Sequence, residues 1–134
     1  MKRSIHILIV VLCTLILLGI GFSLVFRQVE TNLQNLVTLP IAPSVPVSLA
    51  DGLYEGTYST FPVKVRVQVH VLDQRIQAIS LLEHRNGQGE PAEAILETIV
   101  EEQSLAVDTI SGATYSSIVI LKAVEQALAK AGNP

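Results

Sequence analysis

A chain of 134 residues has room for one small domain, and 49% of its residues are hydrophobic against 16% charged. Residues 51–134 hold six Lys or Arg and eleven Asp or Glu, hence a net charge of −5, which disfavours nucleic acid as a partner. The single cysteine, Cys13, precedes this acidic part, which therefore has no disulfide, thiolate metal site or cysteine nucleophile.

The first expected element is a transmembrane helix over residues 5–26, which contain no Asp, Glu, Lys or Arg. About 20 apolar residues in a helix span a bilayer core, so this segment is expected to contact the lipid bilayer. A cleaved signal peptide, with a shorter apolar core, and a lipoprotein anchor on Cys13 are the alternatives. Lys2 and Arg3 precede the segment, so the positive-inside rule places residues 1–4 in the cytoplasm and everything after Phe26 outside the cell membrane.

Residues 27–50 are expected to form a linker. Four apolar residues have helical spacing and indicate an amphipathic continuation of the membrane helix: Val29, Leu33, Leu36 and Val37. A frayed polar helix end is the alternative. Pro40, Pro43 and Pro46 then recur at every third residue, which favours a semi-rigid polyproline II spacer over a PxxP ligand for a signalling domain.

Residues 51–134 are expected to fold as an α+β domain, with a small antiparallel sheet of about three strands packed with two helices. Tyr54 to Thr60 is rich in Tyr, Thr and Gly, which is typical of a strand. From Val63 to Val71 valines alternate with polar residues, as in a sheet with one buried and one solvent-facing side. Asp73-Gln74 then forms a turn into a third strand over residues 76–84.

Two helices are expected after a loop that contains Gly87 and Gly89. Pro91 suits the first turn of the earlier helix. Its apolar face is formed by Ile95, Leu96, Ile99 and Val100. The later helix begins between Thr114 and Ser117 and ends at Gly132. Its packing side is formed by Ile118, Leu121, Val124 and Leu128.

Small and hydroxyl-bearing residues gather between the two helices, from Asp108 to Thr114. Unpaired backbone N–H groups, the positive end of a helix dipole and close approach at Gly112 would together suit an anion. An ordinary Ser/Thr cap beside a Gly-containing loop is the alternative. The three histidines lack metal-ligand spacing, and neither a hydrolase elbow nor a dinucleotide fingerprint is present. We therefore expect no catalytic residue and no metal site.

This segment resembles the flavinylation motif of the FMN-binding domain family. The family includes membrane subunits of sodium-pumping NADH:quinone reductase and Rnf complexes, and stand-alone extracytoplasmic electron-transfer proteins. The motif is Asp, two variable residues, Ser or Thr, Gly or Ser, Ala and Thr. Its specified positions are matched by Asp108, Ser111, Gly112, Ala113 and Thr114. The resemblance extends over residues 51–134, although in many relatives an acidic residue and a Pro precede the glycines of the loop at residues 85–90.

The resemblance implies that FMN is the cofactor and that a phosphoester joins it to Thr114. A separate Mg²⁺-dependent flavin transferase, using FAD as its substrate, would form this bond. The resemblance also implies that Ser111 and Ser117 can donate to the phosphate and that Asp108 docks the segment or orders the loop. Candidate ring contacts are His84, Gly87 and Gly89, with a surface position at the strand end as the alternative for His84.

The expected function is therefore that of an extracytoplasmic, membrane-tethered electron carrier that exchanges electrons with membrane redox partners. Such a protein is a redox module more than a complete enzyme, because the flavin performs the redox chemistry. Two alternatives remain at this point. The same fold can bind FMN non-covalently as a sensor or small reductase, or the chain can be a flavin-free, membrane-tethered interaction domain.

Overall fold

The computed structural model describes residues 2–42, 45–46, 48–85 and 89–132. The chain forms two compact units, Met1–Asn32 and Leu33–Pro134. The first unit is a single helix and the second contains all the strands and the shorter helices. Each unit is described by itself below.

Helix α1 spans Lys2–Val37, and its apolar residues from Ile7 to Phe26 are exposed. From His6 to Val37 the mean hydropathy reaches 2.9, so the helix is long and apolar enough to cross a membrane. It continues beyond residue 26 without fraying, because Thr31 donates to the carbonyl of Arg27 and Gln28 donates to Asn32 within the helix. The predicted helical continuation into the linker is therefore confirmed.

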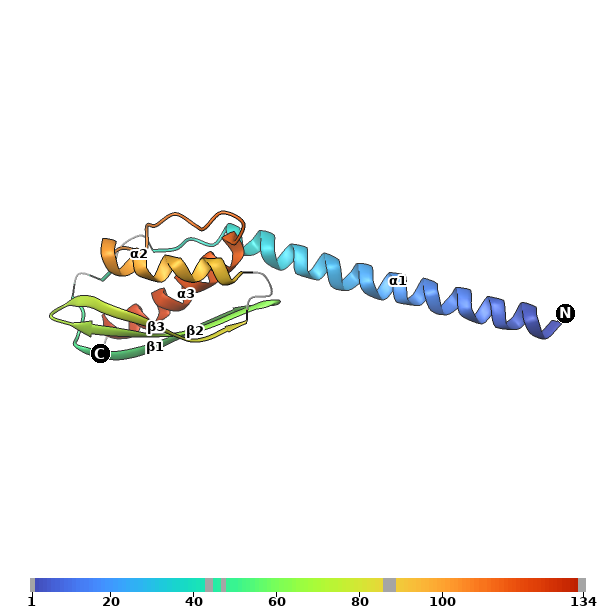
Figure 1. Ribbon diagram of the computed structural model, residues 1–134, viewed down its shortest axis with the longest axis horizontal. Coiled ribbons are helices and arrows are strands. Elements are labelled where there is room, and N and C mark those ends of the chain that lie inside the picture. Colours follow the sequence, from blue (N-terminus) through green and yellow to red (C-terminus); the bar gives the residue numbers. More distant parts are fainter. Residues whose placement is uncertain (1, 43–44, 47, 86–88, 133–134) are drawn as a thin grey trace. The chain divides into compact units, whose positions relative to one another are not determined.

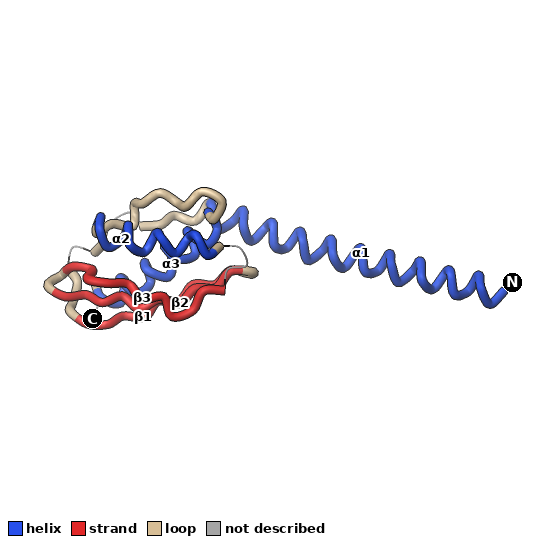
Figure 2. The backbone as a smooth tube through the Cα atoms, viewed as in Figure 1, coloured by secondary structure: helices blue, strands red, loops and turns tan. Residues whose placement is uncertain are grey.

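Three strands form one antiparallel sheet in the order β1-β2-β3: β1 Gly52–Thr60, β2 Val63–Leu72 and β3 Arg75–Arg85. All three predicted strands are present (Figure 2). The alternating valines of β2 are buried and face the core, as their spacing predicted. Asp73 and Gln74 join β2 to β3 with φ of 53° and 59°, the backbone that a two-residue type I′ turn requires.

The two helices that follow the strands in the chain cover one face of this sheet (Figure 1). A 3₁₀ turn, η1 Glu90–Ala94, has Pro91 at its start, and α2 Ile95–Glu102 follows it beside β3. The longest helix of the unit, α3 Thr114–Ala131, packs across β1 and β2. The predicted apolar faces of both helices point into the core, and the α+β prediction is confirmed.

Helix α3 approaches β1 most closely at Gly56, which is buried. A Cβ atom at this position would lie 1.9 Å from the carbonyl oxygen of Ala123 and 2.8 Å from the amide nitrogen of Ala127. The absence of a side chain at Gly56 therefore allows the helix backbone to sit directly on the strand.

The end of α2 is fixed to the start of β3 by the side chain of Gln103. Its Oε1 accepts from the amide of Ile76 at 2.9 Å, and its Nε2 donates to the carbonyl of Ile76 at 2.8 Å. The same Nε2 donates to the carbonyl of Val100 at 2.6 Å. One amide group thus bonds to backbone groups of an edge strand and of a helix end.

The segment assigned to a linker packs on the domain over its described residues after Asn32. Leu36 and Leu49 are only 2% and 3% exposed and belong to the core. Ala42 donates from its backbone nitrogen to Glu125 at 2.8 Å, and Lys122 donates to the carbonyl of Pro40. This part of the chain is therefore held along α3. Pro43 of the predicted polyproline spacer lies outside the described residues.

Charged and polar side chains occupy the outer face of the sheet. Lys64 on β2 and Glu83 on β3 form an ion pair with 3.1 Å between Nζ and Oε2. The hydrogen bond from Lys64 holds the pKa of Glu83 below its ordinary value of 4.5, and the charges of Lys64, Arg85 and Arg66 act in the same direction.

Candidate functional site

Thr114 is the first residue of helix α3 and is partly buried. Ala113 precedes it as the N-cap residue, with φ −132° and ψ 30°, and forms no side-chain capping bond. Neither Thr114 nor Ser111 therefore caps the helix, contrary to the alternative of an ordinary Ser/Thr cap. The amide groups of the first turn and the positive end of the helix dipole remain available to an anion at the position of Thr114.

Ser117 fixes the loop before α3 through two hydrogen bonds to its backbone. Its hydroxyl is fully buried, donates to the carbonyl of Ala113 at 3.0 Å and accepts from the amide of Ile110 at 3.1 Å. The amide of Ala113 also donates to the carbonyl of Ile110 at 2.9 Å. The structure thus gives Ser117 two partners within the protein, and the predicted role as a phosphate donor stays a prediction.

The remaining motif residues lie on the outside of this loop. Asp108, Ser111 and Gly112 are exposed, as is Thr109 beside them. Gly112 has φ +79°, a left-handed conformation that glycine adopts without steric cost. The loop is thus held by hydrogen bonds on its inner side and exposes Asp108, Ser111 and Gly112 on its outer side.

A pocket of about 180 Å³ adjoins the start of α3. One wall comes from α3 and the loop before it, through Gly112, Ala113, Tyr115 and Ser116. The opposite side consists of Leu33, Pro62, Val63 and Gly89. Thr114 lies between two of the lining residues in sequence. The pocket is therefore mainly apolar and open, with a hydroxyl-bearing helix start at its edge, an arrangement suited to a flat aromatic group linked to an anion.

The structure brings only some of the predicted flavin contacts to this pocket. Gly89 lines it, whereas Gly87 lies outside the described residues. His84 is not among the described lining residues. It projects toward the core side of β3, is 3% exposed at its side chain, and its Nδ1 lies 2.8 Å from Oε1 of Glu93. A surface position at the strand end is therefore wrong for His84, because the sheet and η1 enclose it.

Tyr115 and Ser116 are pocket residues that sequence reasoning did not identify. Tyr115 is 40% exposed and Ser116 only 3% exposed. Both directly follow the flavinylation motif, which is the one sequence signal that points to them. Their orientation depends on how α3 is seated against the turn between β1 and β2, and no local pattern encodes that seating.

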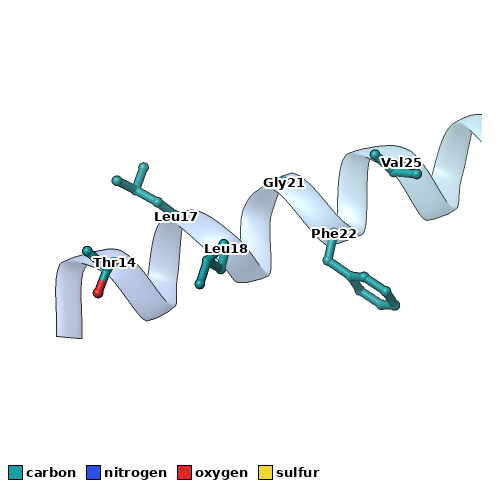
Figure 3. Close-up of a pocket in the computed structure, with 6 residues that line it drawn as sticks. All are labelled: Thr14, Leu17, Leu18, Gly21, Phe22 and Val25. Carbon is teal, nitrogen blue, oxygen red and sulfur yellow. The ribbon is translucent and has the colours of Figure 1, made fainter. Parts of the chain in front are cut away.

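A second apolar groove lies along α1 alone and is lined by Thr14, Leu17, Leu18, Gly21, Phe22 and Val25 (Figure 3). The hydroxyl of Thr14, its only polar side chain, already donates to the carbonyl of Val11 at 2.8 Å. The groove has no cation or spare donor for a phosphate. Its composition suits contact with lipid acyl chains instead.

Comparison with known proteins identifies the family of this chain. An uncharacterized protein of Treponema pallidum (strain Nichols) is 31% identical over 86 residues, which cover 62% of this chain and 24% of that protein. The chain thus spans about a quarter of the length of this relative. Residues 59–129 match the family model of the FMN-binding domain, a range that contains the whole flavinylation motif and most of the pocket. The chain belongs to the FMN-binding domain family.

Proposed function

We propose that this protein is an extracytoplasmic, membrane-tethered electron carrier whose FMN is esterified to Thr114. Family membership supports FMN as the cofactor, and FMN supplies the redox chemistry when it is bound. Helix α1 supports the tether, because it is apolar enough to span a membrane. The observation that carries the proposal is the place of Thr114, which combines a motif hydroxyl, an uncapped helix start and an adjoining pocket.

The residues present fit both ends of FMN. At the phosphate end, the first-turn amides of α3 lack side-chain capping partners, and exposed Ser111 lies three residues before Thr114. Backbone N–H groups at a helix start bind phosphate without any cationic side chain. At the ring end, the apolar walls from Leu33, Pro62 and Val63 suit a flat aromatic surface, with Tyr115 at the edge.

Attachment requires a second protein. Oγ of Thr114 would form a bond to the FMN phosphorus of FAD, while the bond between the two phosphates breaks, AMP leaves and the hydroxyl proton is released. An unassisted threonine hydroxyl is a weak nucleophile, so a flavin transferase with Mg²⁺ would supply activation and charge neutralisation. The exposed loop gives such an enzyme access, and the carboxylate of Asp108 is available for docking at its outer side.

The electron donors and acceptors would be membrane redox partners. The chain has no dinucleotide-binding fingerprint, so we infer that electrons arrive from another redox protein rather than from NADH. The pocket is open to solvent along one side, which would leave part of the flavin accessible to a docked partner.

The attachment is tested by intact mass of the full-length protein after co-expression with a flavin transferase. We expect the parent and Thr114→Ser to gain one FMN minus one water, and Thr114→Ala to gain nothing. Thr109→Ala is the matched control, since Thr109 is an exposed hydroxyl of the same loop and should leave the gain unchanged. Flavin that is present before denaturation but released by it would refute the ester and favour non-covalent binding.

The orientation is tested by labelling a new cysteine from outside. Ser59 is exposed on β1, and the native Cys13 lies within the apolar part of α1. We expect a membrane-impermeant maleimide to label Ser59→Cys in intact spheroplasts and to leave the parent unlabelled. Labelling that requires cell lysis would place the domain in the cytoplasm and contradict the proposal.

A further inference from the structure

Ser116 is an almost fully buried residue whose hydroxyl forms no hydrogen bond within the part of the chain that the structure describes and keeps access to the pocket. It is the third residue of α3, is 3% exposed and lines the pocket beside Thr114. The protein leaves the bonding capacity of this hydroxyl unused, so its partner must come from the pocket, either as water or as a ligand. A ligand that occupies the pocket would provide the missing partner.

The neighbouring serine shows what a purely structural hydroxyl looks like here. Ser117 is also buried, but it both donates to Ala113 and accepts from Ile110, so its bonding capacity is used within the protein. Successive residues on a helix point about 100° apart. The loop therefore forms hydrogen bonds with Ser117, whereas Ser116 faces the pocket.

Ser116 is also the main hydrogen-bonding side chain of the pocket. Tyr115 carries the only other side-chain hydroxyl among the described lining residues, and it is 40% exposed. The remaining lining residues are apolar or glycine: Leu33, Pro62, Val63, Gly89, Gly112 and Ala113. In such surroundings a single donor orients a ligand, because the lining offers few other polar groups.

We propose that the hydroxyl of Ser116 donates a hydrogen bond to an oxygen of the bound FMN and holds the flavin in the pocket. This inference rests on the proposed function. Ser116 would act as a positioning residue that leaves the formation of the ester untouched, since the transferase acts on Thr114. Loss of one such bond should lower the ratio of docked to undocked flavin about fivefold.

The test compares the full-length parent with Ser116→Ala, Ser116→Thr and the surface control Ser59→Ala, each with and without flavin. Intact mass reports attachment. The rise in melting temperature on flavinylation and the quenching of flavin fluorescence by iodide report docking. We expect the same mass gain in all four proteins. In Ser116→Ala we expect a smaller rise in melting temperature and faster quenching, whereas Ser116→Thr and Ser59→Ala should behave as the parent.

Spectra of the same samples identify the acceptor oxygen. A changed visible absorption spectrum in Ser116→Ala places the acceptor on the ring, and a changed ³¹P resonance places it on the phosphate. Equal docking in Ser116→Ala and the parent, with the mass gain intact, overturns this inference and leaves the proposed function standing. If the parent gains no mass, the proposed ester fails. The inference is then decided by titration with free FMN, where equal Kd values for the parent and Ser116→Ala overturn it.

Discussion

Replacing Gly56 with alanine should strongly destabilise the domain, because helix α3 sits directly on this residue. The new Cβ would lie 1.9 Å from the carbonyl oxygen of Ala123 and 2.8 Å from the amide nitrogen of Ala127. Both are backbone atoms in the middle of α3, so no side chain can turn away to make room. The helix or the strand must shift as a whole.

Overpacking of a core costs about 1–3 kcal/mol, and a clash with backbone belongs at the upper end of that range. We therefore expect Gly56→Ala to lower the free energy of unfolding by about 3 kcal/mol. For a domain of this size, that corresponds to a fall in melting temperature of about 12–24 °C. Such a loss is a large part of the about 5–15 kcal/mol that stabilises a typical domain.

The assay is thermal unfolding of the full-length, unmodified protein in detergent, followed by tyrosine fluorescence, since Tyr54 and Tyr58 flank Gly56 on β1. Ser59→Ala, an exposed change on the same strand, should stay within about 0.5 kcal/mol of the parent. A Gly56→Ala protein that melts within about 4 °C of the parent would refute the contact between α3 and β1 at this position.

Three further predictions test other parts of the structure. Ser117→Ala should lower the free energy of unfolding by about 1–3 kcal/mol, because it leaves the part-buried amide of Ile110 without an acceptor. Ser116→Ala should not lower the melting temperature of the unmodified protein. Equal losses of stability in the two variants would contradict the different bonding of the two serines. Gln103→Ala should cost a similar amount and speed amide hydrogen exchange at the start of β3, and unchanged exchange there would argue against the side-chain bridge. Glu83 has a lowered pKa, so its stabilising contribution exists above about pH 4.5 and disappears as the pH falls through the lower folded-state pKa. Unfolding curves of Glu83→Gln and the parent should thus differ slightly at pH 7 and less so at high salt, and they should converge once the pH lies below the lowered pKa of Glu83. A difference that does not change with pH would refute the pairing with Lys64.

Local periodicity was sufficient to predict the sheet and the helices. The valines from Val63 to Val71 alternate with polar residues, and burial of every second side chain follows directly from that pattern. The buried faces of α2 and α3 follow equally directly from the spacing of their hydrophobic residues. The motif residue Thr114 was also placed correctly at the beginning of a helix. These features depend on residues close together in the chain, so the sequence alone is enough to predict them.

Features that depend on tertiary packing were not predictable in the same way. The spaced prolines after Val37 indicate an extended linker, yet Leu36 and Leu49 fill gaps that exist only once α3 and the sheet are assembled. The distinction between Ser116 and Ser117 depends on the seating of α3, and the burial of His84 depends on η1 closing over β3. Each outcome is decided by contacts between segments far apart in the chain.

The burial of Leu36 and Leu49 determines where the FMN-binding domain can be separated from the apolar part of helix α1. A soluble fragment that begins at Asp51, the apparent start of the domain, would lack both leucines and the backbone bond from Ala50 to Ala131. Deleting a buried leucine side chain costs about 2–5 kcal/mol, so two such losses approach the whole stability of a small domain. A fragment that begins at Leu33 keeps these residues. A fragment intended to fold for spectroscopy or crystallisation should therefore begin within α1, before Leu36.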